Sequence, residues 1–421
     1  MANNVIKISQ ISPSTKLVDP LILPLTFFDL MWLKEDPTNR VNFYKLTESS
    51  SDTFYSEILP KLEQSLSLVL THFLPLSGHL KWEPKDLKPH IVVLPQDVVT
   101  LTVAETDADF SRVTSKGLRH QTELRALVSE LPVSSDSASI LTLANHFFPE
   151  ARLLHRNHNP PCCYGRQNRD RTVINLPTEL ESKIFEFPPY LSEEKANVRT
   201  LKVPPTKEIK DLVRITLEMT QENVEKLRER AKSHESTLSD DLHLSTFVIT
   251  YAYVLTCMVK ARGDDEDRLV PFTYVADFRE RLDPPVPVTY FGNCVLPINL
   301  NRDKAETFLG EDGFVNAVKI LSDSVRGLKA ESIWKLYEAG LKKMELGLQK
   351  LSVTGSTKFG MYGSDFGWGK PVSTDNVSIS QELLFSMSER RDETGGVEIG
   401  MCLKKSEMDV FVSLFRNGLE N

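Results

Sequence analysis

The run DFGWGKP at residues 365–371 constrains the fold of this chain more than any other stretch. Gly367 and Gly369 allow backbone conformations and close approaches that a side chain would forbid. Trp368 lies between them, and a ring of that size usually packs against apolar surface and finds a partner for its indole N–H. The carboxylate of Asp365, beside apolar residues, needs a cation or several N–H donors. This combination is typical either of a tight turn beside a core strand or of a functional site.

The complete run resembles the DFGWGKP signature of the plant BAHD acyltransferases, which transfer an acyl group from coenzyme A to an alcohol or an amine. A second run, YFGNC at residues 290–294, resembles a signature of the branch that acylates anthocyanins and other phenolic glucosides. Further segments resemble the same branch, so that the resemblance covers nearly the whole chain. These segments are Pro24–Asp29, Leu74–Gly78, Leu244–Val248 and Gly395–Gly400.

The resemblance implies an α/β fold of two chloramphenicol-acetyltransferase-like domains with an active-site channel between them. It implies no bound cofactor but an acyl-CoA co-substrate, either malonyl-CoA or a hydroxycinnamoyl-CoA. The implied acceptor is a sugar hydroxyl of a flavonoid, anthocyanin or phenolic glucoside, and the implied assembly is a monomer. A polar, proline-bearing stretch at Lys202–Lys210 puts the domain boundary near residue 200, which gives domains at 1–200 and 201–421.

Composition adds broad limits to this reading. A chain of 421 residues exceeds one typical core, so two domains are expected. A net charge of −8 without a basic segment argues against nucleic acid as a partner. The longest apolar stretch, Phe247–Val259, is too short to span a bilayer, and the N-terminus has no apolar core of signal-peptide length. We therefore expect a cytosolic protein without a membrane partner, in which the five cysteines are reduced and mostly buried.

Apolar spacing predicts several elements of the fold. Residues Ser56–Phe73 have the periodicity of a helix that packs on a sheet. Segments rich in β-branched residues predict three strands, at Ile91–Leu94, Thr100–Val103 and Arg214–Met219. Thr220 and Ser245 carry hydroxyl side chains, and each is the expected N-cap of the helix that follows it.

Acyl transfer from a thioester needs a base, because the attacking hydroxyl loses its proton as it attacks, and histidine suits that role. The family supplies this base from an HxxxD motif, in which the aspartate is mainly structural. None of the nine histidines of this chain has an aspartate at the fourth following position. His79 and His146 are followed there by glutamate, and His79 lies in a segment that resembles a non-catalytic family motif.

The segment where HxxxD belongs, Ala144 to about Asn168, resembles nothing in the family and has no apolar period. A back-translation of Asn159–Asn168, read from its second base, encodes Thr-His-His-Ala-Ala-Met-Asp-Gly-Lys, which contains the motif. We therefore predict that this segment is translated out of frame. The family histidine then falls at Pro161 and the family aspartate at Gly165. A gene-model error and a real frameshift both remain open.

A metal site is a weaker alternative for the same segment. His155, His158, Cys162 and Cys163 are all ligand types, but adjacent cysteines and an HxxH spacing do not match the usual zinc patterns. We expect no metal. We also expect an incomplete N-terminal domain, because the core helix that follows HxxxD in the family has no counterpart here. The chain as written is then unstable or inactive, or it is a degenerate paralogue that at most binds coenzyme A or phenolics.

The resemblance assigns roles to the motifs that survive. Asp365, Phe366, Gly367, Trp368 and Gly369 form the structural motif, in which Asp365 is expected to make an ion pair with one of two arginines. Those arginines are Arg279 and Arg281, and the alternative is that both lie exposed on a polar turn.

Five further residues remain candidates on the substrate side. Ser245 and Thr246 begin a helix that can meet a coenzyme A phosphate, although a plain N-cap is favoured. Tyr290 and Asn293 either shape the acceptor site or pack, and the same alternatives hold for Cys294.

Overall fold

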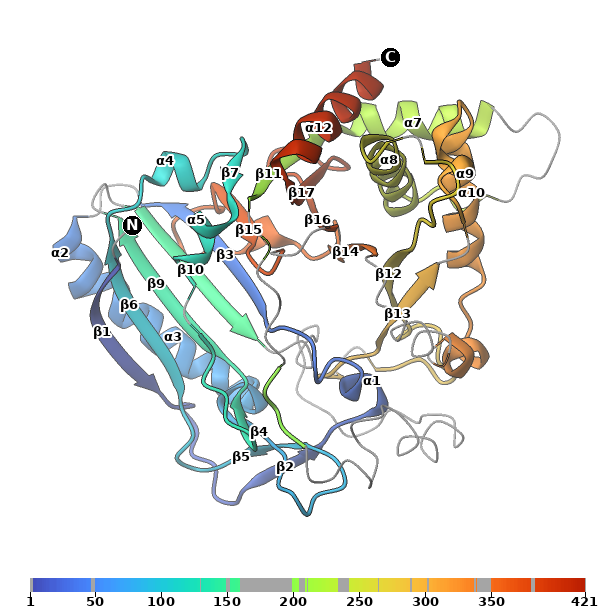
Figure 1. Cartoon of the computed structure of the whole chain (residues 1–421). Helices are drawn as coiled ribbons and strands as arrows, with labels where there is room; N and C mark the ends of the chain where they lie inside the picture. Colours follow the sequence, from blue (N-terminus) through green and yellow to red (C-terminus); the bar gives the residue numbers. More distant parts are fainter. Residues whose placement is uncertain are drawn as a thin grey trace.

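Two large sheets lie on opposite sides of the molecule, with helices packed against each of them (Figure 1). The computed structural model describes residues 3–46, 50–128, 130–148, 152–159, 199–203, 209, 211–233, 242–263, 265–287, 290–300, 303–336, 338, 350–379 and 383–420. This mixture of helices and sheets agrees with the predicted α/β class.

The first sheet has six strands, and each pair of neighbours is antiparallel except β6 and β9, which are parallel. In spatial order they are β1 (Asn3–Ile11), β6 (Val99–Thr106), β9 (Thr142–Phe148), β10 (Arg152–Asn159), β3 (Thr38–Lys45) and β15 (Ser373–Asn376). The predicted strand Thr100–Val103 lies within β6 and is confirmed.

Helices cover both faces of this sheet. One long helical run lies on the first face, formed by α2 (Ser51–Thr53), a π-helical turn (Phe54–Ile58) and α3 (Leu59–His72). The run begins five residues before the predicted helix and ends at His72, one residue before its predicted end. The opposite face is covered by α4 (Phe110–Val113) and α5 (Gln121–Arg125). The strands therefore contribute side chains to two separate apolar cores, one on each face.

The second sheet has seven strands, in which β12 pairs parallel with β14 and β14 with β16. In spatial order they are β13 (Val295–Leu300), β12 (Phe272–Asp277), β14 (Leu351–Gly355), β16 (Leu384–Glu389), β17 (Val397–Lys404), β11 (Leu212–Met219) and β7 (Arg119–His120). The predicted strand Arg214–Met219 forms most of β11. Its helices are α7 (Gln221–Ser233), α8 (Thr246–Ala261), α9 (Glu306–Leu309), α10 (Gly313–Arg326) and α12 (Lys405–Glu420).

Helix α8 is the centre of the larger core, because every residue from Val248 to Val259 is buried. Thr220 and Ser245 both act as predicted N-caps. The Thr220 hydroxyl accepts a hydrogen bond from the Asn223 N–H at 3.1 Å. The helices therefore begin where the capping residues indicated.

A small third sheet and several short turns complete the described fold. The small sheet consists of β2 (Leu21–Pro24), β5 (His90–Val93), β4 (His79–Lys81) and β8 (Ser137–Ser139), and β5 contains most of the predicted strand Ile91–Leu94. The short helices are α1 (Phe27–Leu30), η2 (Leu74–Ser77), η7 (Ala330–Ser332) and η8 (Met361–Gly363).

The two large sheets exchange strands. β15 comes from the C-terminal half of the chain but pairs with β3 of the first sheet, whereas β7 comes from the N-terminal half and pairs with β11 of the second (Figure 1). The exchange means that a single cut in the sequence does not separate the sheets. The boundary near residue 200 remains a prediction, since residues 160–198 lie outside the described part.

A buried ion cluster holds this exchange together. The Asp375 carboxylate on β15 lies 2.9 Å from the Arg119 guanidinium on β7 and also pairs with the Arg214 guanidinium on β11. Arg214 donates a further hydrogen bond to the Asn376 carbonyl at 3.0 Å. All three charged side chains are at most 5% exposed. Burial lowers the pKa of Arg119, and the Asp375 charge opposes that effect.

No helix within the described ranges is long and apolar enough to cross a membrane. Three of the five cysteines are described, and Cys257, Cys294 and Cys402 are buried thiols outside any disulfide. Within the same residues, no three potential metal ligands lie together. The side chains of His155 and His158 and the residues Cys162 and Cys163 lie outside the description.

Replacing Asp375 with alanine would leave two guanidinium groups buried without their counter-charge. We expect Asp375→Ala to lower the free energy of unfolding by about 3–5 kcal/mol, the usual effect of breaking a buried ion pair. Urea denaturation followed by circular dichroism measures this change. The matched control is Glu222→Ala, which breaks an exposed pair with Lys226 and is expected to cost about 0–1 kcal/mol. Equal losses in the two variants would contradict the assigned role of Asp375.

Candidate active site

The predicted position of the catalytic motif follows β10 directly. β10 lies between β9 and β3, and its last residue, Asn159, pairs with Thr38 at the start of β3. The next residue that the structure describes after Asn159 is Arg199. Pro161 and Gly165, the predicted positions of the family histidine and aspartate, therefore lie outside the described residues.

The DFGWG loop binds its own carboxylate. The Asp365 Oδ1 atom accepts hydrogen bonds from the N–H groups of Gly367 at 2.7 Å and Gly369 at 3.0 Å. Both glycines have positive φ, +92° and +83°. Backbone N–H groups presented by such a turn form a small concave site for a negative oxygen. The two glycines that flank Trp368 are thus needed to turn the backbone toward Asp365.

The prediction that Asp365 forms an ion pair with Arg279 or Arg281 is wrong. Among the described residues Asp365 contacts neither Arg279 nor Arg281, and it is exposed. The Arg279 guanidinium instead lies 3.1 Å from the Asp277 carboxylate and donates to the Gly292 carbonyl at 2.6 Å. Arg281 donates to the Asp277 carbonyl. The physical reason is that loop amides already satisfy the Asp365 carboxylate, so it needs no distant cation.

The aromatic residues of the loop pack on the first sheet. The ring of Tyr44, on β3, meets the rings of Trp368 and Phe366 edge to face, with centroids 5.7 and 5.6 Å apart. Its hydroxyl lies 2.8 Å from the Ser364 Oγ atom, and burial raises the pKa of this phenol. Tyr44 is thus the anchor that fixes the loop to the N-terminal half of the chain.

The loop and the end of β10 lie at opposite ends of the first sheet. Tyr44 pairs with Leu153 at the start of β10, whereas Asn159 is six residues farther along. At 3.3 Å per residue, this separates the Tyr44 end from the Asn159 end by about 20 Å. The DFGWG loop therefore has an architectural position, remote from the place where the chain leaves β10.

The YFGNC motif forms a buried junction with the N-terminal half. The Asp29 Oδ1 atom accepts hydrogen bonds from the Asn293 main-chain N–H at 3.3 Å and from its Nδ2 at 3.1 Å. The other Asp29 oxygen accepts from the Thr26 N–H at 2.9 Å and hydroxyl at 2.8 Å. Asp29 and Asn293 are both fully buried. Asp29 and Asn293, 264 residues apart in sequence, thus join two motifs through one carboxylate.

The rest of YFGNC packs around this junction. Tyr290 is 3% exposed, and a Cβ at Gly292 would lie 2.4 Å from its hydroxyl oxygen, so only glycine fits beneath the phenol ring. Cys294 is fully buried, and burial raises the pKa of its thiol to about 12, which leaves it protonated and unreactive at neutral pH. Of the two alternatives for Asn293 and Cys294, packing agrees with these contacts.

Ser245 also takes the plainer of its two predicted roles. Its hydroxyl accepts from the Val248 N–H at 3.4 Å and so caps α8. Thr246 is the first residue of the helix and is partly buried. A phosphate contact by either side chain remains a prediction.

A second network beside the loop was not predicted. The Tyr362 hydroxyl donates to the Glu398 carboxylate at 2.8 Å, and the Lys116 ammonium lies 2.6 Å from the same group. Burial raises the pKa of Glu398, and Lys116 opposes that effect. Because Tyr362 precedes Asp365 by three residues, this network fixes the start of the loop to β17. A glutamate inside the apolar run Val397–Gly400 was the only sequence signal for it.

A small cavity lies where the two large sheets face each other. Its volume is about 30 Å³, and its lining includes Arg40 and Thr374 from the first sheet and Ser386 and Gly400 from the second. This space suits a single water molecule and is far too small for an acyl-CoA.

Comparisons with known proteins cover the whole chain. The model of the Transferase family matches residues 3–146 and 135–417. A BAHD acyltransferase of Arabidopsis thaliana is 60% identical over 450 residues, covering 100% of this chain and 99% of that protein. An agmatine coumaroyltransferase of the same plant is 54% identical, covering 100% of both. Its phenolic glucoside malonyltransferase 2 is 45% identical, covering 95% of this chain and 94% of the relative.

Solved structures give the same fold at low identity. Vinorine synthase superposes with a TM-score of 0.70 at 18% identity and covers 98% of each chain. TRI101 of F. graminearum, in complex with ethyl coenzyme A, gives a TM-score of 0.63 at 15% identity, covering 93% of this chain and 96% of the other. Both likenesses support the two-domain α/β architecture expected from the sequence.

The alignments also contain a gap. The 421 residues of this chain align over 450 positions with its 60% identical relative, so at least 29 positions, the difference, hold no residue of this chain. The family match consists of two pieces that overlap at residues 135–146. The overlap ends three residues into the segment 144–168, which has no counterpart in the sequence signatures.

An alanine at Gly367 would place a side chain in the left-handed region of backbone space. We expect Gly367→Ala to cost about 1–2 kcal/mol of unfolding free energy, because the Cβ crowds the following carbonyl oxygen at φ +92°. Gly363→Ala is the matched control in the same segment, since its φ is ordinary and a Cβ there meets no atom within 4 Å. Urea denaturation of both variants checks this. A Gly367 variant as stable as the Gly363 variant would refute the assigned backbone role.

Replacing Asp29 would remove an acceptor shared by two motifs. We expect Asp29→Ala to lower the free energy of unfolding by about 1–3 kcal/mol, because buried donors on Thr26 and Asn293 lose their acceptor. Thermal unfolding monitored by circular dichroism is a suitable measurement. Asp19→Ala is the control, since Asp19 is exposed and outside any ion pair in the described residues. Equal melting temperatures for the two variants would show that the junction does not stabilise the fold.

Proposed function

The chain belongs to the Transferase family of BAHD acyltransferases, and from that premise we propose that it derives from an acyl-CoA-dependent acyltransferase whose proton acceptor it has lost. Members of the family use an acyl-CoA as co-substrate. In that reaction a base takes the proton of the acceptor O–H or N–H as the oxygen or nitrogen attacks the thioester carbonyl, and the coenzyme A thiol leaves. A chain without the base keeps the family scaffold but not this step.

One observation carries the proposal: no histidine here is followed by an aspartate four residues later. We assign the family histidine position to Pro161 and its aspartate position to Gly165, whose side chains accept no proton. The family match falls into two pieces that overlap at residues 135–146, and this supports a disruption of the family sequence close to that point. The loss of a positioned base usually slows such a reaction about a hundredfold to ten-thousandfold.

The described strands support a later start for the shifted segment than Ala144. Every residue of β9 is buried. The ring of Phe147 stacks on Phe54 with centroids 5.0 Å apart, and Phe148 meets Phe110 edge to face at 5.0 Å. Such packing is typical of a sequence selected for that core. We therefore put the start of the shift after Phe148.

The sequence of β10 is unusual for its place in the sheet. The strand lies between two others, where apolar and β-branched residues are favoured. Its sequence, RLLHRNHN, provides only Leu153 and Leu154 as apolar residues, and both are fully buried. A central strand with six polar residues fits a segment that was not selected for this position.

The surface of α3 supports the loss of a neighbouring helix. Leu68 is 53% exposed and Val69 46% exposed, although both belong to the helix Ser56–Phe73 that was predicted to pack on a sheet. Each large apolar side chain that such a helix would bury contributes about 1.5–3 kcal/mol. A domain has a net stability of only about 5–15 kcal/mol. We therefore propose that the N-terminal domain is incomplete and of low stability.

For the ancestral reaction we propose transfer of a malonyl or hydroxycinnamoyl group to a sugar hydroxyl of a flavonoid, anthocyanin or phenolic glucoside. The YFGNC run and the 45% identity to a phenolic glucoside malonyltransferase support this acceptor. We also propose that the protein is a monomer and that it is located in the cytosol. Size-exclusion chromatography and a fluorescent fusion are the measurements for these two points.

An amine acceptor is a second candidate. The 54% identity to an agmatine coumaroyltransferase exceeds the identity to the malonyltransferase and favours a hydroxycinnamoyl donor with an amine. A protein with the reading frame restored from cDNA separates the two. Turnover of coumaroyl-CoA with agmatine supports the amine, and turnover of malonyl-CoA with a phenolic glucoside supports the sugar hydroxyl.

The purified chain as written is expected to turn over acyl-CoA at least about a hundredfold more slowly than the agmatine coumaroyltransferase assayed beside it. Release of the free coenzyme A thiol measures the rate. The relative with its own motif histidine changed to alanine provides the matched control for loss of the base. Turnover equal to that of the unaltered relative would show that the proposal is wrong.

Two further measurements separate the remaining alternatives. A cDNA sequence across the codons of residues 144–168 distinguishes an error of the gene model from a real frameshift. Isothermal titration with malonyl-CoA, combined with the turnover assay, tests for a non-catalytic paralogue, for which binding without turnover is the expected result.

A further inference from the structure

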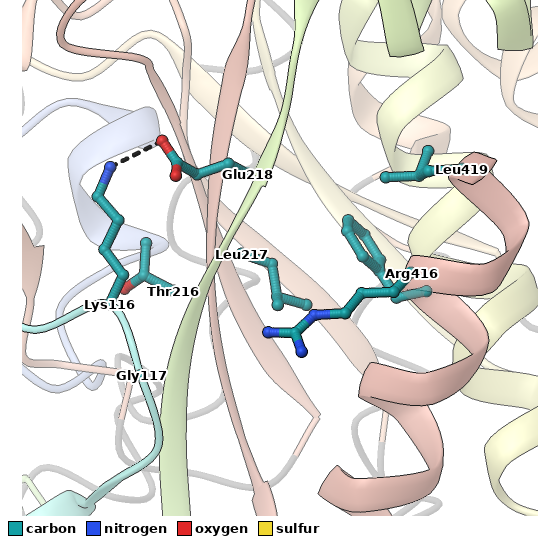
Figure 2. A pocket seen from close by; sticks show the side chains of 8 residues that line it. Lys116, Gly117, Thr216, Leu217, Glu218, Arg416 and Leu419 are labelled. Carbon is teal, nitrogen blue, oxygen red and sulfur yellow. Dashed lines mark hydrogen bonds and ion pairs between the residues drawn. The ribbon is translucent and has the colours of Figure 1, made fainter.

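A cavity of about 260 Å³ lies between β11 and α12, at the edge of the second sheet (Figure 2). β7 pairs with only Val213 and Arg214 of β11, and the Thr216 N–H then donates to the Lys116 carbonyl at 2.9 Å. The cavity belongs to neither the DFGWG loop nor the YFGNC junction.

The floor of the cavity is apolar. Leu217 on β11 is 5% exposed, Phe415 on α12 is 1% exposed, and Leu419 lies one helical turn beyond Phe415. Gly117 and Arg416, which are both exposed, border the same space. Leu419 is only partly buried, so a flat apolar group placed here would cover this side chain while one end remained near the solvent.

One cation at this cavity has no counter-charge. The Arg416 side chain extends from α12 toward β11 in Figure 2, and it makes no ion pair or hydrogen bond with any residue that the structure describes. Lys116 differs, because its ammonium lies 2.8 Å from the Glu218 carboxylate and 2.6 Å from that of Glu398. The Glu218 charge is in turn shared with Arg390 at 3.1 Å. The charge available to a ligand is therefore that of Arg416.

We propose that this cavity binds a small aromatic carboxylate. A guanidinium matches a carboxylate with two parallel N–H···O bonds, and the apolar floor suits one ring. The volume lies just below the roughly 300–1,000 Å³ of drug-sized ligand sites, which admits a single-ring acid and excludes an intact acyl-CoA.

The probe for this site is 4-hydroxycinnamate, whose binding to the full chain is measured by saturation-transfer NMR and isothermal titration. Excess coenzyme A is present throughout, so that binding at an acyl-CoA site does not contribute. We expect Arg416→Gln to weaken binding roughly tenfold to a hundredfold, the effect of losing a charge-assisted hydrogen-bonded pair. The uncharged amide of the same acid should bind to the unaltered chain as weakly as the acid binds to the Arg416→Gln variant.

Arg125→Gln is the matched control, because Arg125 is an exposed arginine that likewise makes no ion pair in the described structure. It should bind the probe as the unaltered chain does. Leu419→Trp, which fills the cavity without removing the charge, should abolish binding. Circular dichroism first establishes that each variant keeps its fold. Absence of binding to the folded unaltered chain overturns the proposal, and so does equal binding by Arg416→Gln.

This test is separate from the proposed function, because it measures neither turnover nor the sequence of the altered segment. Full acyl-CoA turnover by the purified chain would contradict the proposed loss of the base, but it would not bear on ligand binding at the cavity. A chain without turnover that still binds the acid at Arg416 would support both inferences.

Discussion

The contact between Asp375 and two buried arginines is the constraint on which the arrangement of the two sheets depends. Three charges removed from water are costly to bury, and they are tolerated only when each meets its opposite at close range. Arg119 and Arg214 meet the same carboxylate, one from each half of the chain. Because Asp375 lies on a strand that the C-terminal half contributes to the first sheet, this pairing fixes both exchanged strands in register.

The signature motifs take part in the same architecture. The DFGWG loop folds around its own aspartate and then packs its two rings on Tyr44 of the first sheet. The YFGNC run lies against Asp29 of the N-terminal half. Both motifs therefore join the halves of the chain. They survive intact in a chain whose catalytic motif is missing, which agrees with a structural rather than a chemical role for them.

The loss that we propose affects the scaffold unevenly. The C-terminal half keeps a continuous core around α8, in which twelve consecutive residues are buried. The N-terminal half keeps its sheet but exposes part of α3 and places a polar sequence in its central strand. A protein of this kind would retain surfaces that bind small molecules, such as the cavity beside Arg416, independently of the chemistry of its family.

The sequence alone determined the class of fold, the main helices and strands, and the family, because apolar period, N-caps and short signatures are local properties of the chain. It also determined that no HxxxD motif is present. It could not identify the partner of Asp365, because two glycine amides two and four residues away compete successfully with any distant arginine. The Arg119–Asp375–Arg214 cluster and the cavity at Arg416 were decided only by the tertiary structure, since their residues are far apart in sequence and meet only when the sheets exchange strands.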